Sequence, residues 1–350
     1  MLNPRLYLDH AATTPMLPAA REAMADALGR WANPSSPHRE GRAARAALEE
    51  ARARIVAALG WQGALIFTSG ASEALAIALG RAKAGERRIS TVEHDAVRRV
   101  AKDAAPVPVG ADGLILLGDV PAGALVAVQA VNNETGVIQP LEAIAGAVRA
   151  AGGLLLADCA QSAGKLPLPD ADFIAVSAHK LGGPPGIGAL LVRDLATLTP
   201  SGGQEQGYRA GTENLPAAIG FAAALEARGA RDHMAALRDR LDAVIRAGGG
   251  MVVADGSPRL AEIGSYRMPG VPAAAQLIQF DAAGIAVSAG SACSSGSLKP
   301  SHVLAAMGWD EMAAREVVRV SFGANTDMTA VDRFVAEWTR MADRARARAA

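Results

Sequence analysis

Short apolar runs that end in polar residues, separated by segments with helical periodicity, constrain the fold of this chain more than any other feature. The runs are nearly continuous, which is typical of strands covered on both faces of a parallel sheet. They span residues 64–70, 124–131, 153–158, 172–177 and 186–192, and segments 72–80, 95–104 and 141–151 have the pattern of helices. This alternation predicts an α/β protein with a mostly parallel sheet.

The length of 350 residues is enough for about two domains. Residues 214–246 have the pattern of a long helical region interrupted near Gly229, after which strands and helices mix more loosely. We expect an N-terminal segment, 1–15, that joins the small domain. A large domain should cover residues 16–249, and a smaller α+β domain residues 250–350.

The charge composition narrows the class of partner. Lys plus Arg and Asp plus Glu both total 35, so the formal net charge is zero. Nucleic acids and anionic membranes recruit proteins through a basic excess, which this chain lacks. The start of the chain has no signal-peptide pattern, and no uncharged apolar run reaches the roughly 18 to 20 residues of a membrane span. We therefore expect a cytoplasmic protein that acts on a small molecule, without nucleic-acid or membrane partners.

Polar and small residues gather where the predicted strands end. In an open parallel sheet, ligands bind in the crevice outside the carboxyl ends of the strands. The strand-end residues are Thr68, Ser69, Gly70, Ala71, Ser72, Asn132, Asn133, Glu134, Asp158, Gln161, Ser177, His179 and Lys180. Together they form the candidate site, and we expect no metal in it.

The stretch TSGASEA, residues 68–74, leads from a strand through a glycine into a helix. Free backbone N–H groups and the helix dipole favour an anion such as phosphate at such a place. An ordinary glycine turn with Ser72 as the N-cap explains the stretch about equally well. A phosphate gains support from Ser177 and His179, which end another strand and can add donors.

Asp158 ends one predicted strand and Lys180 ends the next. Pyridoxal phosphate needs such a pair: an amine for a Schiff base, and a carboxylate that keeps the pyridine nitrogen protonated. Lys180 is the best placed of the five lysines, because Lys83 and Lys102 lie in charged stretches expected to be helical. Either residue alone is more often structural, but the pair beside a phosphate loop favours the cofactor.

The two cysteines are too few for a disulfide framework, so both are available as thiols. Cys293 lies in a Gly/Ser tract, residues 288–301, whose composition is typical of exposed, mobile loops. Cys159, directly after Asp158, fits the commoner role of a small buried hydrophobe, and we assign it no chemistry.

Arg319 lies in VVRVSF, where Val318, Val320 and Phe322 should share one face and the arginine the other. Two interpretations remain open at this point. The side chain is either solvated on a half-exposed face, or it is a bidentate fork for a substrate carboxylate.

The order of the motifs resembles the cysteine desulfurases of the NifS/IscS type, in the class V aminotransferase family. The resemblance covers nearly the whole chain and rests on YLDHAATTP, FTSGASEA, EHDAV, VNNETGVIQP, DCAQSAGK, SAHKLGGPPGIGALLV, YRAGTEN, GIAVSAGSACSSGSLKPSHVLAAMG and VVRVSFG. It implies the fold type I architecture of pyridoxal phosphate enzymes.

The resemblance also implies residue roles. Lys180 would form the Schiff base and Asp158 would pair with the pyridine nitrogen. His94 would stack on the ring and assist proton transfer, and Asn133 and Gln161 would bind the ring oxygen and its surroundings, Asn133 also near the substrate. The phosphate would be held by Ala71, Ser72, Ser177 and His179, with Thr212 from the second subunit of a homodimer. Arg319 would bind the substrate carboxylate, and Cys293 would accept the sulfur.

The activity implied is conversion of L-cysteine to L-alanine, with a persulfide on Cys293 that passes sulfur to an iron–sulfur scaffold or a carrier for tRNA thiolation. A selenocysteine lyase, an aminotransferase or a catalytically idle assembly platform are the alternatives. The sequence departs from the family in Ser72 for the usual threonine, in GGPPG after Lys180, in FGANT after Arg319 and in a short C-terminus. The short C-terminus, where relatives often dock a scaffold partner, leaves the sulfur acceptor open.

Overall fold

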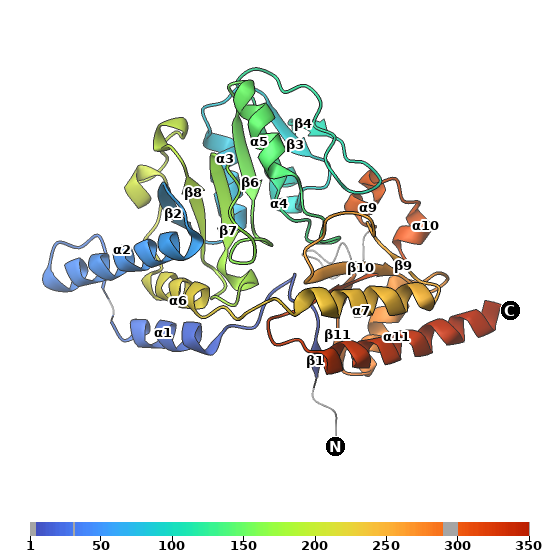
Figure 1. The fold of residues 1–350 in the computed structure, drawn as a ribbon. Coiled ribbons are helices and arrows are strands. Elements are labelled where there is room, and N and C mark those ends of the chain that lie inside the picture. Colours follow the sequence, from blue (N-terminus) through green and yellow to red (C-terminus); the bar gives the residue numbers. More distant parts are fainter. Residues whose placement is uncertain (1–4, 31, 290–299, 350) are drawn as a thin grey trace.

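The computed structural model describes residues 5–30, 32–289 and 300–349. Figure 1 shows two bodies, one built on a seven-stranded sheet and one on a four-stranded sheet. Among the described helices, none combines the length and the apolar character needed to cross a membrane.

The seven-stranded sheet has the order β2-β8-β7-β6-β5-β3-β4. Its strands are β2 (Ala64–Thr68), β8 (Gly188–Val192), β7 (Phe173–Ser177), β6 (Leu154–Asp158), β5 (Leu125–Gln129), β3 (Arg87–Ser90) and β4 (Ala105–Val107). Only β8 is antiparallel to its neighbours, so the predicted mostly parallel sheet is confirmed.

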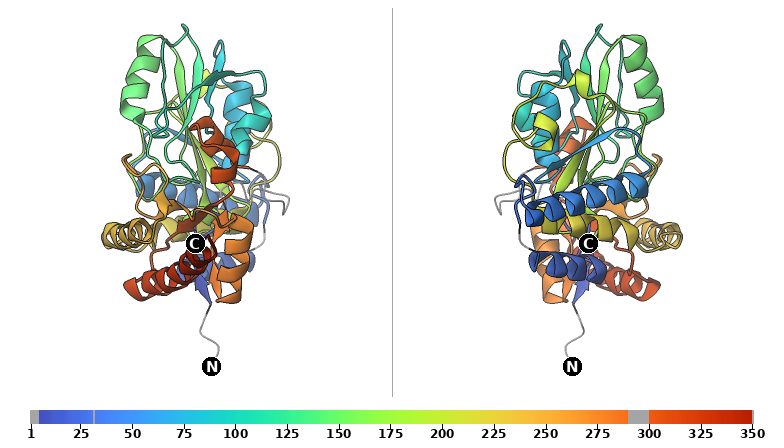
Figure 2. Two further views of the ribbon diagram at one scale, coloured as in Figure 1. Left: turned by 90° about the vertical axis from the view of Figure 1, so that its right-hand side faces the viewer. Right: turned by 90° about the vertical axis from the view of Figure 1, so that its left-hand side faces the viewer.

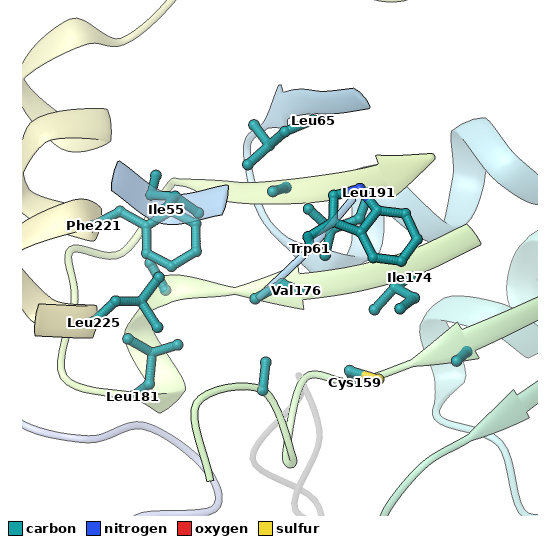
Figure 3. Packing of buried hydrophobic residues seen from close by; sticks show 14 of the residues in the cluster. Ile55, Trp61, Leu65, Cys159, Ile174, Val176, Leu181, Leu191, Phe221 and Leu225 are labelled. Atoms are coloured by element: carbon teal, nitrogen blue, oxygen red, sulfur yellow. The ribbon is translucent and has the colours of Figure 1, made fainter. Parts of the chain in front are cut away.

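Helices cover both faces of this sheet, which explains the continuous apolar runs. The helices are α1 (Pro18–Leu28), α2 (Arg39–Leu59), α3 (Ala71–Arg81), α4 (Asp95–Val100), α5 (Leu141–Ala150) and α6 (Leu215–Glu226). Along β2, Leu65 and Phe67 pack with α2, α5 and α6 in one core cluster, and Ile66 packs with α3 and α4 in another. Figure 3 shows part of the first cluster, and the right-hand view of Figure 2 shows α1, α2 and α6 side by side.

The helix expected over residues 95–104 is shorter than predicted. It ends at Val100, where Ala101 leaves the helical conformation with φ −104° and ψ 53°, and residues 105–107 form β4. Pro106 lacks the N–H that a continuing helix would need, and as part of the sheet-edge strand β4 it is tolerated.

The second body contains the antiparallel sheet β12-β13-β10-β9. Its elements are β9 (Met251–Val252), β10 (Ile263–Arg267), β12 (Ser288–Ala289), β13 (Val317–Ser321), α7 (Met234–Ala247), α8 (Ala273–Ala282), α9 (His302–Ala306), α10 (Glu311–Ala314) and α11 (Met328–Ala349). Near the N-terminus, β1 (Leu6–Tyr7) pairs with β11 (Ile285–Ala286), and Leu8 is buried in the core of this body.

Helix α7 lies before the expected domain boundary at residue 250, yet its buried residues Met234, Leu237 and Leu241 belong to the second core. The boundary stays a prediction. The packing favours a division in the connection between α6 and α7.

Candidate active site

A cavity of about 740 Å³ lies at the carboxyl edge of the seven-stranded sheet. Twelve of the sequence-predicted site residues line it: Ser69, Gly70, Ala71, Ser72, His94, Asn133, Asp158, Gln161, Ser177, His179, Lys180 and Arg319. We call the residues that follow strands of the large sheet the sheet wall. Ala11, Ala12 and Arg319, which come from the N-terminal segment and β13, form the junction wall.

The start of α3 provides a cradle of backbone donors in the sheet wall. Gly70 is the N-cap, with φ 154°, a value that favours glycine, and Ala71 and Ser72 form the first turn. Ser72 is therefore inside the helix, and its interpretation as the N-cap is wrong. The first N–H groups of a helix lack intrahelical partners and favour an anion.

Gly188 allows the α3 cradle to lie close to the end of β7. It pairs with Thr68 of β2 on one side and with Ser177 of β7 on the other. A Cβ at position 188 would lie 2.4 Å from the Val176 carbonyl oxygen and 2.7 Å from Gly70 Cα. Because backbone atoms cannot yield to such contacts, only glycine fits here.

Asp158 and Lys180 lie at the same edge because β6 and β7 are neighbouring parallel strands. Asp158 is the last residue of β6 and is largely buried, and its Oδ1 accepts the Ala160 N–H at 2.9 Å. Lys180 ends a short 3₁₀ turn, Ala178–Lys180, that directly follows β7. The pair thus places an amine and a carboxylate in one cavity.

His94 is the N-cap of α4, and its Nδ1 accepts the Ala96 N–H at 3.1 Å. Burial and the charge of Lys180 lower the pKa of His94. The ring is therefore neutral near pH 7, with the proton on Nε2. A neutral imidazole in this cavity can both pack on an aromatic ring and exchange a proton.

His179 is tied to the N-terminal segment, because its Nδ1 lies 3.1 Å from Thr13 Oγ1. Burial, with a contribution from Lys180, lowers its pKa. His179 lines the cavity together with Ser177, and its role toward a phosphate stays a prediction.

Arg319 is only 5% exposed, so the solvated interpretation of this residue is wrong. Val318, Val320 and Phe322 pack in the second core as expected, and the arginine projects to the cavity. Its Nη2 donates to Asp9 Oδ1 at 2.8 Å, and its Nη1 donates to the Asn133 carbonyl oxygen at 3.0 Å.

Three buried polar atoms of cavity residues have no protein partner among the described residues: Gln129 Nε2, Gln161 Oε1 and Arg319 Nε. Gln161 Nε2 donates to the Ala11 carbonyl oxygen at 2.9 Å, so its orphaned oxygen has a fixed orientation. Unpaired buried polar groups are costly, which indicates a polar ligand. A phosphorylated pyridine aldehyde fits, with its phosphate at α3, its ring nitrogen at Asp158 and its aldehyde at Lys180.

Three of the strand-end residues, Thr68, Asn132 and Glu134, are buried but do not line the cavity. Thr212 is exposed and does not line the cavity of the single chain, so its role in a second subunit stays a prediction. Cys293 lies outside the described residues. Cys159 is fully buried in the core, as expected, and burial raises the pKa of its thiol to about 12.

Sequence reasoning missed Asp9, Glu93 and Gln129. Gln129 ends β5 and lines the cavity, so the strand-end rule could have found it. Glu93 is fully buried, its Oε1 accepts the Gln129 N–H at 2.8 Å, and burial raises its pKa. Asp9 carried one signal, its place in the motif YLDHAATTP.

Lys83 and Lys102 were expected within helices, but each lies just beyond the end of one, α3 and α4 respectively. Neither lines the cavity. Among the described residues that line the cavity, Lys180 is the only lysine.

Comparison with known proteins places this geometry in a family. A model for class-V aminotransferases matches residues 6–334. An IscS-like cysteine desulfurase of Mycobacterium tuberculosis is 40% identical over 93% of each chain. The solved structure of a NifS-like protein from Rickettsia africae superposes with a TM-score of 0.86 and 29% identity, covering 97% of this chain and 99% of that one.

A structure described as SspA in complex with cysteine superposes with a TM-score of 0.79 and 29% identity, over 92% of this chain and 99% of that one. These likenesses confirm the fold type I architecture. The matches span almost the whole chain and show that it belongs to the class-V aminotransferase family of pyridoxal phosphate enzymes, among the cysteine desulfurases of the NifS/IscS type.

Proposed function

We propose that the protein converts L-cysteine to L-alanine and retains the sulfur as a persulfide on Cys293. The observation that carries the proposal is the meeting of Lys180, Asp158 and Arg319 in one cavity, an amine, a carboxylate and a carboxylate-binding fork. The solved structure of SspA with cysteine supports the choice of substrate.

When bound, pyridoxal phosphate supplies an electron sink for the bonds to the substrate Cα. Ala71, Ser72, Ser177 and His179 would hold its phosphate, and Asp158 would keep its ring nitrogen protonated. His94 and Gln161 would orient the ring. Lys180 would hold the aldehyde carbon in the resting enzyme, and its amine would then move a proton at the substrate Cα.

Residues of the junction wall would orient the substrate. Arg319 would bind the α-carboxylate through the side of the guanidinium that has no protein acceptor among the described residues. Asn133, whose carbonyl oxygen holds Arg319 Nη1, would lie beside the bound substrate.

The sulfur step needs a thiol. The Cys293 thiolate would attack the substrate sulfur, so that an S–S bond forms while the substrate C–S bond breaks. The electron pair stays with the carbon fragment, which gains protons and leaves as alanine. One cysteine and one thiol thus yield one alanine and one persulfide, and no external oxidant is required.

We further propose a cytoplasmic homodimer in which Thr212 reaches the phosphate of the other subunit. The persulfide would be passed to a protein acceptor, an iron–sulfur scaffold or a carrier for tRNA thiolation. The exposed position of Thr212 supports the first part.

The test is to supply L-cysteine to the purified holoenzyme without a keto acid, and to measure alanine and the mass of Cys293 after alkylation. Equal alanine and sulfane sulfur, with the extra sulfur on Cys293, is the expected result. Alanine formed only with a keto acid would indicate an aminotransferase. A strong preference for selenocysteine, without a persulfide, would indicate a selenocysteine lyase, and a colourless inactive protein an assembly platform.

A further inference from the structure

The N-terminal segment runs along β13, although more than 300 residues separate the two in sequence. The Ser321 N–H donates to the Leu8 carbonyl oxygen at 2.8 Å, and the Ala11 N–H donates to Ser321 Oγ at 2.9 Å. These bonds flank Asp9, which forms a bridge with Ser321. Residues 8–11 therefore hold Asp9 at a fixed place beside the strand that carries Arg319.

Asp9 in turn contacts Arg319. The Asp9 Oδ1 atom lies 2.8 Å from Arg319 Nη2, and the exposed fraction of the Asp9 side chain is 21%. The backbone carbonyl of Asp9 also accepts the Tyr7 hydroxyl at 3.1 Å. Backbone contacts of the N-terminal segment thus hold the Asp9 carboxylate beside the guanidinium.

The guanidinium has five N–H groups, and protein oxygens within hydrogen-bond distance engage two of its nitrogens. The Asn133 carbonyl oxygen binds Nη1 and Asp9 binds Nη2, whereas the buried Nε has no acceptor among the described residues. The two bonds fix the plane of the fork, and the remaining N–H groups stay available to a ligand in the cavity.

We propose that Asp9 is a positioning residue that orients Arg319 toward the substrate carboxylate, and that this is why the N-terminal segment packs on β13. The inference rests on the proposed function, since it assumes that Arg319 receives that carboxylate. An arginine side chain loses rotamer entropy when it is fixed, and an acceptor that holds it in advance reduces this cost on binding.

Other titratable groups lie near the pair. Tyr7 and Glu134 both interact with Arg319, and the Glu134 carboxyl accepts the Ser301 hydroxyl at 2.5 Å. Without Asp9, Glu134 is an alternative carboxyl partner for Arg319. A guanidinium that turned toward Glu134 would no longer present its fork to the cavity.

The test uses two aminooxy reagents that would displace the Lys180 amine from the cofactor's aldehyde carbon, aminooxyacetate and methoxyamine, which differ only in a carboxylate. Their rate constants with the holoenzyme are followed through the cofactor's visible absorbance, so no turnover is needed. The ratio of the two rates reports recognition of the carboxylate. The variants are Asp9→Ala, Asp9→Asn and Arg319→Ala.

Asp281→Ala is the matched control, because Asp281 also pairs with an arginine of the N-terminal segment, Arg5, but lies outside the cavity. In Asp9→Ala we expect the ratio to fall about tenfold, the equivalent of about 1.4 kcal/mol, with the methoxyamine rate unchanged. Asp9→Asn, which keeps an oxygen acceptor, should restore part of the ratio. Asp281→Ala should keep the parent ratio.

Three results would overturn the inference. A parent ratio in Asp9→Ala, with a reduced ratio in Arg319→Ala, would remove the role of Asp9 and leave the proposed function intact. Equal slowing of both reagents in Asp9→Ala would mean a purely structural role. If Arg319→Ala kept the rate ratio of the parent enzyme, Arg319 would not bind the carboxylate, and Asp9 could not act through it. If Asp9→Ala does not fold, Asp9→Asn decides by the same ratio.

Discussion

The two walls of the cavity are built from different kinds of contact. In the sheet wall, Asp158 and Lys180 follow strands that hydrogen-bond to each other, so their proximity is a property of one sheet. In the junction wall, Asp9 meets Arg319 across 310 positions of sequence, and the two approach only after the N-terminal segment has packed on β13. The large sheet alone thus brings Asp158 and Lys180 together, whereas the substrate fork depends on how segments from both ends of the chain meet.

The strongest test of this division is Lys180→Ala. Loss of the sheet-wall amine removes both the group that holds the cofactor and the group that moves the proton, so visible absorbance and turnover should both vanish. Lys102→Ala, at an exposed turn, is the control and should behave as the parent. A Lys180→Ala enzyme that kept its colour and its activity would mean that another lysine is used.

Substitution of each cysteine in turn tests which thiol accepts the sulfur. Cys293→Ser should lower alanine and sulfide formation by orders of magnitude and leave no persulfide for mass spectrometry to detect, because a serine hydroxyl has almost no ionised form near pH 7. The cofactor absorbance should still respond to L-cysteine. Cys159→Ser should leave the persulfide in place, because the Cys159 thiol is buried and remains protonated at pH 7.

His10, next to Asp9 in the N-terminal segment, should make the free energy of unfolding depend on pH. Burial, together with the charges of Lys165 and Arg231, lowers the pKa of its imidazole to about 4. The unfolded chain takes up the proton near pH 6.5 but the folded chain only near pH 4, so the free energy of unfolding should fall by about 3 kcal/mol as the pH falls through this window.

Urea unfolding of the parent and of His10→Gln at pH 7 and pH 4.5 measures this contribution. The variant should lose less stability than the parent on acidification. An equal loss of stability in both proteins would mean that the pH dependence comes from other groups and not from His10.

Thr212 gives the smallest expected effect. A hydrogen bond to a charged group contributes roughly 1.5 to 3 kcal/mol, so Thr212→Ala should weaken retention of the cofactor about tenfold in dialysis. Thr199→Ala, an exposed threonine earlier in the same loop region, should not. Light scattering that found a fully active monomer would contradict the shared site.

The sheet and its strand-end residues could be predicted because both depend on local patterns. Apolar runs with polar ends indicate where strands stop, and parallel pairing brings Asp158, Ser177 and Lys180 to one edge. The pattern VVRVSF correctly predicted which residues of β13 enter the core, but it could not show that the N-terminal segment buries Arg319 on the other face.

Other features depend on tertiary contacts that no local pattern contains. The helical pattern of residues 95–104 gave no sign that residues 105–107 would pair with β3 at the sheet edge. The helical pattern of residues 214–246 predicted a helix where α7 lies, but it gave no sign that this helix packs in the second core. Asp9 lies in the motif YLDHAATTP, but the motif did not indicate that its partner would be Arg319.

The absence of a side chain at Gly188 limits the width of the α3 cradle. Gly188 lies in β8, the single strand between Thr68 of β2 and Ser177 of β7. There is no space for even a methyl group between the backbone of β7 and Gly70. The distance across the cradle is therefore set by main-chain atoms, which are far stiffer than side chains. Substitution of Ser72 or Ser177 can change individual contacts. The distance between the start of α3 and the end of β7 is nevertheless fixed by the main chain of the sheet.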